Sequence, residues 1–370
     1  MKEKFRIPLS YNAIPSERIS AMLQSYSHRH HDDLIADFEN ELCSLTGAKH
    51  AVALHAGTAA IHLGLKALGV TTGDVVLASS FTYVASINPI LYLSAVPFFI
   101  DSNADDWNMD PNLLEEAILQ CVRKKRQPKA ILVVHTYGMP ANMKTIKAIS
   151  ARHQIPILED AAEALGSTYE GKPLGTLSEA GIFSFNNNKL ITTYGGGALL
   201  TNNSSIAAKA NLWASQSRDN LPFYEHREIG YNYKMGALSA ATGLAQLGFL
   251  KAKVDHRRKT HDAYRKILND KVEWQLEGKD SISNRWITTI KLPQGVKSEA
   301  LQRLLAEKEI ETRPLWKPMH LQPVFKDFEA RVNGCSEKLF TQGLCLPSGD
   351  GLGEEQVNEI AGHILNYLTR

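Results

Sequence analysis

Short apolar runs alternate with helical patterns over the first half of this 370-residue chain. The segments AGTAAIHLGLKALG (56–69), FTYVASINPILYL (81–93) and MKTIKAISARHQ (143–154) carry apolar residues at helical spacing. The runs expected to be strands are Ala51–Leu54, Asp74–Leu77, Val96–Ile100, Pro128–Val134, Ile157–Leu158, Gly181–Ser184 and Gly197–Thr201. Near-continuous apolar strands separated by helices are typical of a sheet covered on both faces. The sequence therefore predicts an α/β fold with a mostly parallel sheet.

The pattern changes after about Leu250. The stretch KAKVDHRRKTHDAYRKILNDKVEW (251–274) is predicted to be one charged amphipathic helix. Further helices are expected in SEALQRLLAEKEI and GEEQVNEIAGHILNYL, with short strands between them. We therefore expect a large α/β domain over residues 12–250. A smaller α+β domain is expected over residues 251–370, which also takes in residues 1–11.

Composition and charge argue against several classes of protein. The net charge of +2 gives no global field that would attract nucleic acid or a membrane surface, and no apolar run is long enough to span a bilayer. The basic run Arg123–Arg126 is either the solvated end of a helix or a phosphate-binding patch, and no aromatic residues interleave with it. The cysteines are Cys43, Cys121, Cys335 and Cys345. They form no close pair, which favours a reducing, cytoplasmic setting.

The polar stretch His28-Arg29-His30-His31-Asp32-Asp33 permits two interpretations. It resembles a metal site in composition, but its histidines lack the i, i+4 spacing of a helical site and Arg29 would oppose a cation. The other interpretation is a polar helix start with Asp32 or Asp33 as its N-cap. We expect no metal site in this chain.

Residues far apart in the sequence suggest a site for a phosphorylated cofactor. Gly57 and Thr58 begin a predicted helix, where free backbone amides and a hydroxyl can bind a phosphate. Asp160, like His135, follows a predicted strand, where ligands of parallel sheets bind. Lys189 is a lone amine in the polar, glycine-flanked stretch SFNNNKLITTYGGGALLTN. An anion site, an acid and an amine are what pyridoxal phosphate (PLP) requires, although each signal alone is weak.

Longer motifs carry more information. The chain contains, in order, AGTAAIHLGLKALGV, EDAAEALGSTYEGKPLGTL, FSFNNNKLITTYGGGAL, IGYNYKMGALSAATGLAQL and RPLWKPMHLQPVF. With these motifs, the stretch from about Asp37 to Gly353 resembles the DegT/DnrJ/EryC1/StrS sugar aminotransferases. The resemblance implies PLP as cofactor and the aspartate-aminotransferase-like fold (PLP fold type I). In that fold a mostly parallel sheet domain is followed by a smaller C-terminal α+β domain.

The resemblance also implies roles for single residues around the cofactor. Lys189 binds the cofactor covalently and later moves a proton during the reaction. Asp160 pairs with the protonated ring nitrogen and keeps the ring electron-withdrawing. Glu163 stands where many relatives have glutamine and lies near the phenolic oxygen of the cofactor. Tyr83 stacks on the ring, with a buried core tyrosine as the alternative.

Other positions are implied to bind the cofactor phosphate. Gly57, Thr58 and Ser184 match the phosphate-binding positions of the family. Asn232 matches a residue that relatives lend to the phosphate of the neighbouring subunit, which implies a homodimer with shared active sites. The triple glycine Gly195–Gly197 is expected to allow tight passage of the backbone near the site.

The presence of Lys189 favours transamination, because related sugar dehydratases have histidine at this position. The motifs are most similar to enzymes that move an amino group, usually from L-glutamate, to carbon 4 of UDP-linked 4-keto-6-deoxy-N-acetylhexosamines in bacterial surface glycan pathways. In that interpretation four residues lie near the sugar nucleotide: Arg313, Trp316, Lys317 and His320. Cations opposite a diphosphate suit this role, and a turn with packing residues is the alternative.

Other substrates and other functions remain as hypotheses. A 3-keto sugar and a GDP- or dTDP-linked sugar are the alternatives within the family. The N-terminal segment SYNAIPSERISAM differs from the Gly-Gly-Asn-Glu type of turn usual in relatives, which bears on the choice of sugar. A regulatory relative could bind PLP and a keto sugar without turnover. An NAD-dependent protein would need a glycine fingerprint after the first strand, and AGTAA lacks that spacing.

Overall fold

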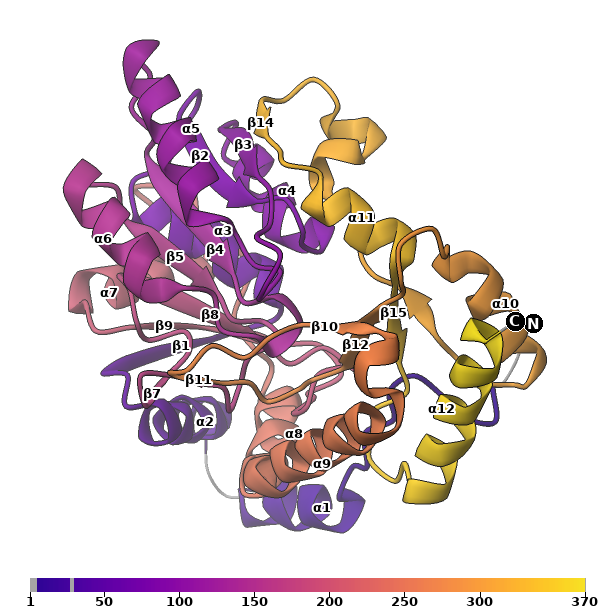
Figure 1. The fold of residues 1–370 in the computed structure, drawn as a ribbon. Coiled ribbons are helices and arrows are strands. Elements are labelled where there is room, and N and C mark those ends of the chain that lie inside the picture. Colours follow the sequence, from indigo (N-terminus) through magenta and orange to yellow (C-terminus); the bar gives the residue numbers. More distant parts are fainter. Residues whose placement is uncertain (1–4, 27–29, 370) are drawn as a thin grey trace.

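The computed structural model describes residues 5–26 and 30–369 (Figure 1). In these residues the largest sheet has eight strands, in the order β1-β9-β8-β5-β4-β2-β3-β14. The strands are β1 His50–Leu54, β2 Val75–Ser79, β3 Val96–Ile100, β4 Ala130–Val134, β5 Ile157–Asp160, β8 Ala180–Ser184, β9 Gly197–Thr201 and β14 Ala330–Arg331. Neighbours from β8 to β14 run parallel, whereas β9 is antiparallel to both β8 and β1. The predicted α/β fold with a mostly parallel sheet is confirmed.

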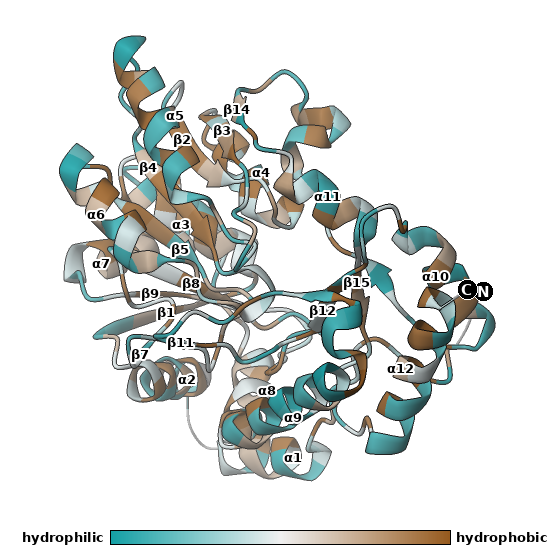
Figure 2. Ribbon diagram, in the orientation of Figure 1, coloured by the Kyte–Doolittle hydropathy of each residue, from teal (hydrophilic) through white to brown (hydrophobic). Residues whose placement is uncertain are grey.

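Helices cover both faces of this sheet. On one face lie α3 Gly57–Ala67, α4 Val84–Tyr92 and α7 Ser204–Ala214, and on the other α5 Pro111–Arg123 and α6 Met143–His153. Successive residues of a strand point to opposite faces, so Val76 of β2 packs in the first layer and Val75 in the second. Figure 2 shows apolar residues along the central strands and hydrophilic ones at the outer end of α5. The sheet is therefore buried on both sides, as its unbroken apolar strands require.

The first helices of the chain lie at the end of the sheet that is formed by β1 and β9. They are α1 Ser16–Ser25 and α2 His31–Thr46, which lie near α8 Ala237–Leu247 (Figure 1). Phe38 and Leu42 of α2 are fully buried and share an apolar cluster with Ala240 and Ala241 of α8. This packing fixes α8 at the edge of the core.

The C-terminal part of the chain builds a second, smaller sheet. Its order is β10-β12-β15-β13, all antiparallel, with β10 Glu273–Trp274, β12 Thr288–Lys291, β13 Arg313–Pro314 and β15 Gly343–Leu346. Around it lie α9 Leu250–Leu268, α10 Ser298–Glu307, α11 Cys335–Gln342 and α12 Glu354–Leu368. A third small sheet joins β6 Thr168–Tyr169 to β7 Lys172–Pro173 and β11 Ser281–Ile282. The division at residues 250 and 251 stays a prediction, and β14 shows that the later range also adds a strand to the large sheet.

The prediction was wrong about where one helix ends. The helix predicted over 251–274 ends at Leu268, and Trp274 instead pairs with Ile290 in the small sheet. The indole of Trp274 donates to the carbonyl of Asn269, which stabilises the turn between helix and strand. Such a long-range pairing leaves no trace in local periodicity.

The start of α2 also differs from the expectation. Its N-cap is His30, whose Nδ1 accepts a hydrogen bond from the backbone N–H of Asp32. Asp32 and Asp33 lie in the first turn, where carboxylates are favoured by the helix dipole. His28 and Arg29 lie outside the described residues. Among the residues described, no group of three or more potential ligands is arranged to hold a metal ion.

The basic run at residues 123–126 ends α5, and it makes a specific contact. Lys124 and Arg126 form ion pairs of 2.5 and 2.9 Å with Glu329, next to β14. The cysteines Cys43, Cys121, Cys335 and Cys345 are free. Within the described part of the chain, no helix combines the length and the apolar character needed to cross a bilayer.

Close backbone contacts explain part of the triple glycine. A Cβ added to Gly197 would lie 2.5 Å from the carbonyl carbon of Ala56, at the start of α3. A Cβ on Gly196 would lie 2.2 Å from Thr193 Oγ1, whereas one on Gly195 would meet nothing within 4 Å. The expected tight passage is confirmed at two of the three positions: Gly197, where β9 runs against the start of α3, and Gly196, which lies against Thr193.

We predict that Gly197→Ala lowers the free energy of unfolding by about 2–3 kcal/mol, because the new methyl group must displace the backbone of α3. Urea unfolding of the cofactor-free protein measures this effect. Gly195→Ala is the matched control, since its methyl group enters open space. Equal stability of the two variants would show that β9 does not constrain α3.

Candidate active site

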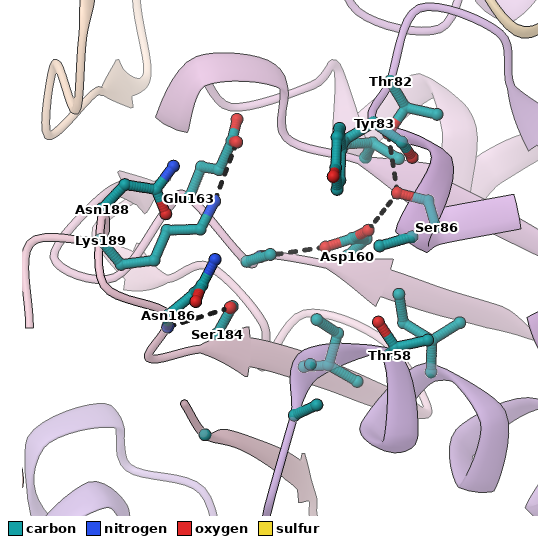
Figure 3. A pocket seen from close by; sticks show the side chains of 18 of the residues that line it. Thr58, Thr82, Tyr83, Ser86, Asp160, Glu163, Ser184, Asn186, Asn188 and Lys189 are labelled. Carbon is teal, nitrogen blue, oxygen red and sulfur yellow. Dashed lines mark hydrogen bonds and ion pairs between the residues drawn. The ribbon is translucent and has the colours of Figure 1, made fainter. Parts of the chain in front are cut away.

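A cavity of about 450 Å³ lies at the carboxyl ends of β4, β5 and β8, beside the start of α3. Strands and helices that are distant in the sequence supply its walls (Figure 3). The predicted site residues in its lining are Gly57, Thr58, Tyr83, Asp160, Glu163, Ser184, Lys189 and Trp316. The structure therefore brings most of the predicted cofactor-binding residues together in one place.

The side chain of Lys189 ends inside this cavity. Its Nζ lies 2.9 Å from Glu163 Oε1 and 4.2 Å from the centre of the Trp286 ring. The Lys189 side chain is only 13% exposed, so its amine meets few water molecules. Figure 3 shows the amine directed at the carboxylate of Glu163. A single amine held in this way can form a covalent bond to an aldehyde or exchange a proton with its neighbour.

Glu163 is a buried carboxylate with a partner on each oxygen. Its Oε1 faces Lys189, and its Oε2 accepts a hydrogen bond of 2.9 Å from the backbone N–H of Tyr137. Burial raises the pKa of Glu163, and the charge of Lys189 acts in the opposite direction. A carboxyl group whose pKa is raised takes up a proton more readily than an exposed one.

Asp160 is the last residue of β5 and is also buried. Its Oδ2 accepts a hydrogen bond of 2.6 Å from Ser86 Oγ, and its Oδ1 accepts one of 3.0 Å from the backbone N–H of Ala162. Burial raises the pKa of Asp160, while the hydrogen bond from Ser86 and the charge of Lys189 oppose that change. No role was predicted for Ser86 from the sequence, although Ser86 lies three residues after Tyr83 in the predicted helix FTYVASINPILYL.

The start of α3 offers donors for an anion. No side chain caps this helix at Ala56, so its first backbone N–H groups have no partner from a capping residue. The hydroxyl-bearing residues Thr58 and Ser184 line the same end of the cavity. A Cβ added to Gly57 would lie 3.1 Å from Ser184 Cβ, which shows how closely helix and strand approach here. A phosphate suits this position because the helix dipole is positive at its N-terminus.

Aromatic rings form one wall. Tyr137 stacks on Trp316 with 4.4 Å between ring centres, and Trp286 lies parallel to Tyr137 at 6.4 Å. Tyr137, in a short 3₁₀ helix over Thr136–Gly138, has a φ of +55° that is unusual for a non-glycine residue. Tyr83 is 59% exposed at the mouth of the cavity and is not the buried core tyrosine that was the alternative. Its stacking on the cofactor stays a prediction.

The remaining predicted site residues do not line the cavity. Asn232 is exposed, and its backbone pairs with Ser215. Arg313 is exposed and pairs with Glu311 at 2.7 Å. His320 Nδ1 lies 2.6 Å from Ser80 Oγ, and the backbone carbonyl of Lys317 accepts a hydrogen bond from Gln322. Their proposed roles depend on a partner subunit or on a substrate that extends beyond the cavity.

His135 supports the site from behind. Its Nδ1 accepts a hydrogen bond from the backbone N–H of Ala141, so the proton is on Nε2, which donates to Glu159 at 3.1 Å. Glu159 is fully buried and accepts further bonds from Gly175 and Leu177. Because these groups satisfy one another, the pair has a structural role at the ends of β4 and β5.

Comparison with known proteins identifies the family. A family model described as the DegT/DnrJ/EryC1/StrS aminotransferase family matches residues 13–365. The chain belongs to this family. It is 44% identical over 342 residues to a Bacillus subtilis (strain 168) protein provisionally named as the pyridoxal phosphate-dependent aminotransferase EpsN, covering 90% of this chain and 88% of that one. It is 35% identical over 335 residues to the GDP-perosamine synthase of Escherichia coli O157:H7, covering 90% of each chain.

A solved structure of the same family confirms the fold. A DegT/DnrJ/EryC1/StrS aminotransferase from Brucella abortus superimposes with a TM-score of 0.90 at 27% identity, over 96% of each chain. The fold is therefore that of the PLP fold type I sugar aminotransferases, as the motifs implied. This DegT/DnrJ/EryC1/StrS protein is a PLP-dependent sugar aminotransferase.

The residues of the cavity fit PLP. The uncapped start of α3 suits the phosphate, and the buried carboxylate of Asp160 suits a protonated ring nitrogen, whose positive charge offsets the cost of burying an acid. The amine of Lys189 suits the aldehyde. When bound, PLP supplies the aldehyde and the ring that withdraws electrons from the reacting carbon.

We predict that Asp160→Asn stabilises the cofactor-free protein but weakens PLP binding. The pKa of Asp160 is raised in the folded protein, so its ionised form costs stability above that pKa, and the cost disappears as the pH falls through it. The midpoint of thermal unfolding should rise by about 2 °C at pH 8 and by less at pH 5.

Differential scanning fluorimetry across pH checks this prediction, and an absorbance titration with PLP checks the binding. Asp105→Asn is the control, because Asp105 is exposed. A stabilisation by Asp160→Asn that does not grow with pH would contradict the assigned cause.

Proposed function

We propose that this aminotransferase moves an amino group from L-glutamate to a nucleotide-linked 4-keto-6-deoxy sugar, in particular a UDP-linked N-acetylhexosamine for bacterial surface glycans. The observation that carries the proposal is the shared cavity of Lys189, Asp160 and the uncapped start of α3. These groups suit the amine, the ring nitrogen and the phosphate of PLP. The similarity of the motifs to those of UDP-sugar 4-aminotransferases supports the finer choice of substrate.

In this proposal Lys189 is the general acid and base of the reaction. A proton must leave the carbon that loses its amine and later reach the carbon that receives it, and only a neutral amine can accept it. Glu163 Oε1, 2.9 Å from Lys189 Nζ, is placed to exchange a proton with this amine. Asp160 stays behind the ring as its anionic partner. The low exposure of both acids keeps water away from the reacting atoms.

The sugar nucleotide is proposed to bind at the aromatic side of the cavity. Trp316 lines the cavity itself, and His320 and Lys317 follow it within four residues. We propose that these residues, with Arg313, contact the sugar and the diphosphate. The indole of Trp316 is suited to the apolar face of a hexose, and the cations to phosphate oxygens.

The second candidate substrate is a GDP-linked 4-keto sugar. The relative named GDP-perosamine synthase is 35% identical to this chain, which favours that nucleotide. Because the cofactor residues are the same in either case, the difference lies in the residues that contact the nucleotide.

We predict that PLP in the purified protein loses its visible absorption band when L-glutamate is added. The resulting enzyme should then aminate a UDP-linked 4-keto-6-deoxy-N-acetylhexosamine at least about tenfold faster than GDP- or dTDP-linked sugars. Mass spectrometry of the products measures this, with 3-keto sugars in the same panel. Preference for a GDP-linked sugar would establish the second candidate.

Lys189→Ala is the control for chemistry in this panel and should lower turnover at least about a thousandfold. A wild-type band that responds to no amino donor would instead favour a regulatory relative that binds PLP without turnover.

We also propose that the protein is a homodimer in which Asn232 reaches the cofactor phosphate of the partner. Exposed apolar side chains occur in the same segment as Asn232, namely Phe223, Tyr224, Ile229 and Leu238. A surface of this kind usually contacts another protein. Asn232 is itself exposed and outside the cavity of its own subunit, as the proposal requires.

We predict that two inactive variants restore activity when mixed. Asn232→Glu places a carboxylate against the phosphate of the neighbouring site, and Lys189→Ala removes the amine of its own site. A mixed dimer contains one site with both residues intact, so random exchange of subunits should recover about a quarter of the wild-type activity. Turnover is measured after unfolding and refolding the mixture. No recovery, with mixed dimers detected by native mass spectrometry, would contradict the shared site.

A further inference from the structure

Residues 186–189 form a loop, called here the Lys189 loop, whose backbone is held by a side chain from the N-terminal segment. The amide nitrogen of Asn12 donates to the carbonyl of Asn187 at 2.9 Å and to the carbonyl of Lys189 at 2.7 Å. The same segment is the part of the chain that departs from the motifs of the family. No role was assigned to Asn12 from the sequence.

The other carbonyls of this loop are also occupied. The carbonyl of Asn186 accepts from the backbone N–H of Lys189 at 3.0 Å, and the carbonyl of Asn188 accepts from Trp286 Nε1 at 2.9 Å. Each carbonyl from residue 186 to residue 189 therefore has a donor. Asn12 provides two of these four bonds, so the path of the loop depends strongly on it.

The other end of the Asn12 side chain contacts a buried cation. Its Oδ1 accepts a hydrogen bond of 3.3 Å from Arg257 Nη2. Arg257 is fully buried, donates to the carbonyl of Ser348 and lies 3.4 Å from Asp350 Oδ1. The orientation of the amide follows from its partners, since carbonyls only accept and a guanidinium only donates.

The N-terminal segment is itself bound to the C-terminal part of the chain. Ile7 exchanges backbone hydrogen bonds with residues 309 and 311, at 3.1 and 2.9 Å. The carbonyls of Leu9 and Tyr11 accept from the backbone N–H groups of Ser348 and Asp350, at 2.9 and 2.7 Å. Asn12 is thus the point at which this extended segment passes from the small sheet to the Lys189 loop.

We propose that Asn12 is a positioning residue that ties the Lys189 loop to Arg257 and to the small sheet. The inference rests on the proposed catalytic role of Lys189. The Lys189 amine stands on a long, flexible side chain, so its position depends on how firmly the loop backbone is held. Any movement of residues 348–350 relative to the large sheet reaches Lys189 through Asn12. The segment that differs from relatives therefore acts on the geometry of the reaction.

Asn12→Asp separates the two contacts of this side chain. The variant keeps an oxygen that can accept the hydrogen bond from Arg257. Its second oxygen faces the carbonyls of Asn187 and Lys189, and no hydrogen bond can form there because neither side has a donor. Amide hydrogen exchange of the cofactor-free protein should become about tenfold faster in residues 187–191 and stay unchanged in β5. In the PLP-loaded enzyme, kcat should fall roughly ten- to a hundredfold, with little change in KM for glutamate.

Tyr11→Ala is the matched control, because the Tyr11 side chain is 58% exposed and its backbone contact with Asp350 remains. It should leave exchange in residues 187–191 as in the wild type. If Asn12→Asp yields no folded protein, Asn12→Ala introduces no charge and serves for the same comparison.

Wild-type exchange in residues 187–191 of the Asn12 variant would overturn the proposal, as would faster exchange spread equally over β5. Faster local exchange with unchanged kcat would overturn the link to catalysis. The exchange measurement needs neither cofactor nor substrate, so its result does not depend on the proposed function. If the proposed function is wrong, the wild-type protein will transfer no amino group, whatever the exchange measurement shows.

Discussion

Two buried carboxylates share one site, and the positive charge that they require organises the residues around them. Asp160 and Glu163 are both buried at the end of β5, and burial raises the pKa of each. The charge of Asp160 raises the pKa of Glu163 further. Leaving such groups without a cation would cost several kcal/mol. Lys189 supplies one positive charge, and the protonated ring of PLP supplies another. The two buried carboxylates therefore explain both the position of Lys189 beside Glu163 and the preference of the site for a cofactor with a protonated ring.

The sheet explains why these groups meet. The carboxyl ends of parallel strands lie along one edge, so Asp160 at the end of β5 and Ser184 at the end of β8 lie at the same edge of the sheet. The first turn of α3 faces them because glycine at positions 57 and 197 lets helix and strands approach closely. Two rings of the aromatic wall come from elsewhere, since Trp286 and Trp316 belong to the C-terminal part of the chain. The cavity is complete only when both parts of the chain are in place.

Much of this arrangement could be predicted from the sequence, and the exceptions share a cause. Strands such as β2 and β4 are buried on both faces, so they appear as unbroken apolar runs. Lys189 and Asp160 stand in long motifs that resemble a known family. Trp286, Asn12 and β14 instead owe their positions to partners that are 98 or more residues away in the sequence, and no local pattern marks them. The predicted end of α9 was also wrong, because pairing with Ile290 places Trp274 in a strand. Contacts of this kind are set by tertiary packing, which periodicity does not report.

The short strand β14 has a consequence for how the chain is made. Ala330 and Arg331 pair with Phe99 and Ile100, so one edge of the large sheet is closed by residues that leave the ribosome long after β3. Until then the nascent chain carries an open, apolar strand edge over VPFFI, which can pair with another molecule. A chain truncated before residue 330 retains this edge permanently, and aggregation during expression is the expected result.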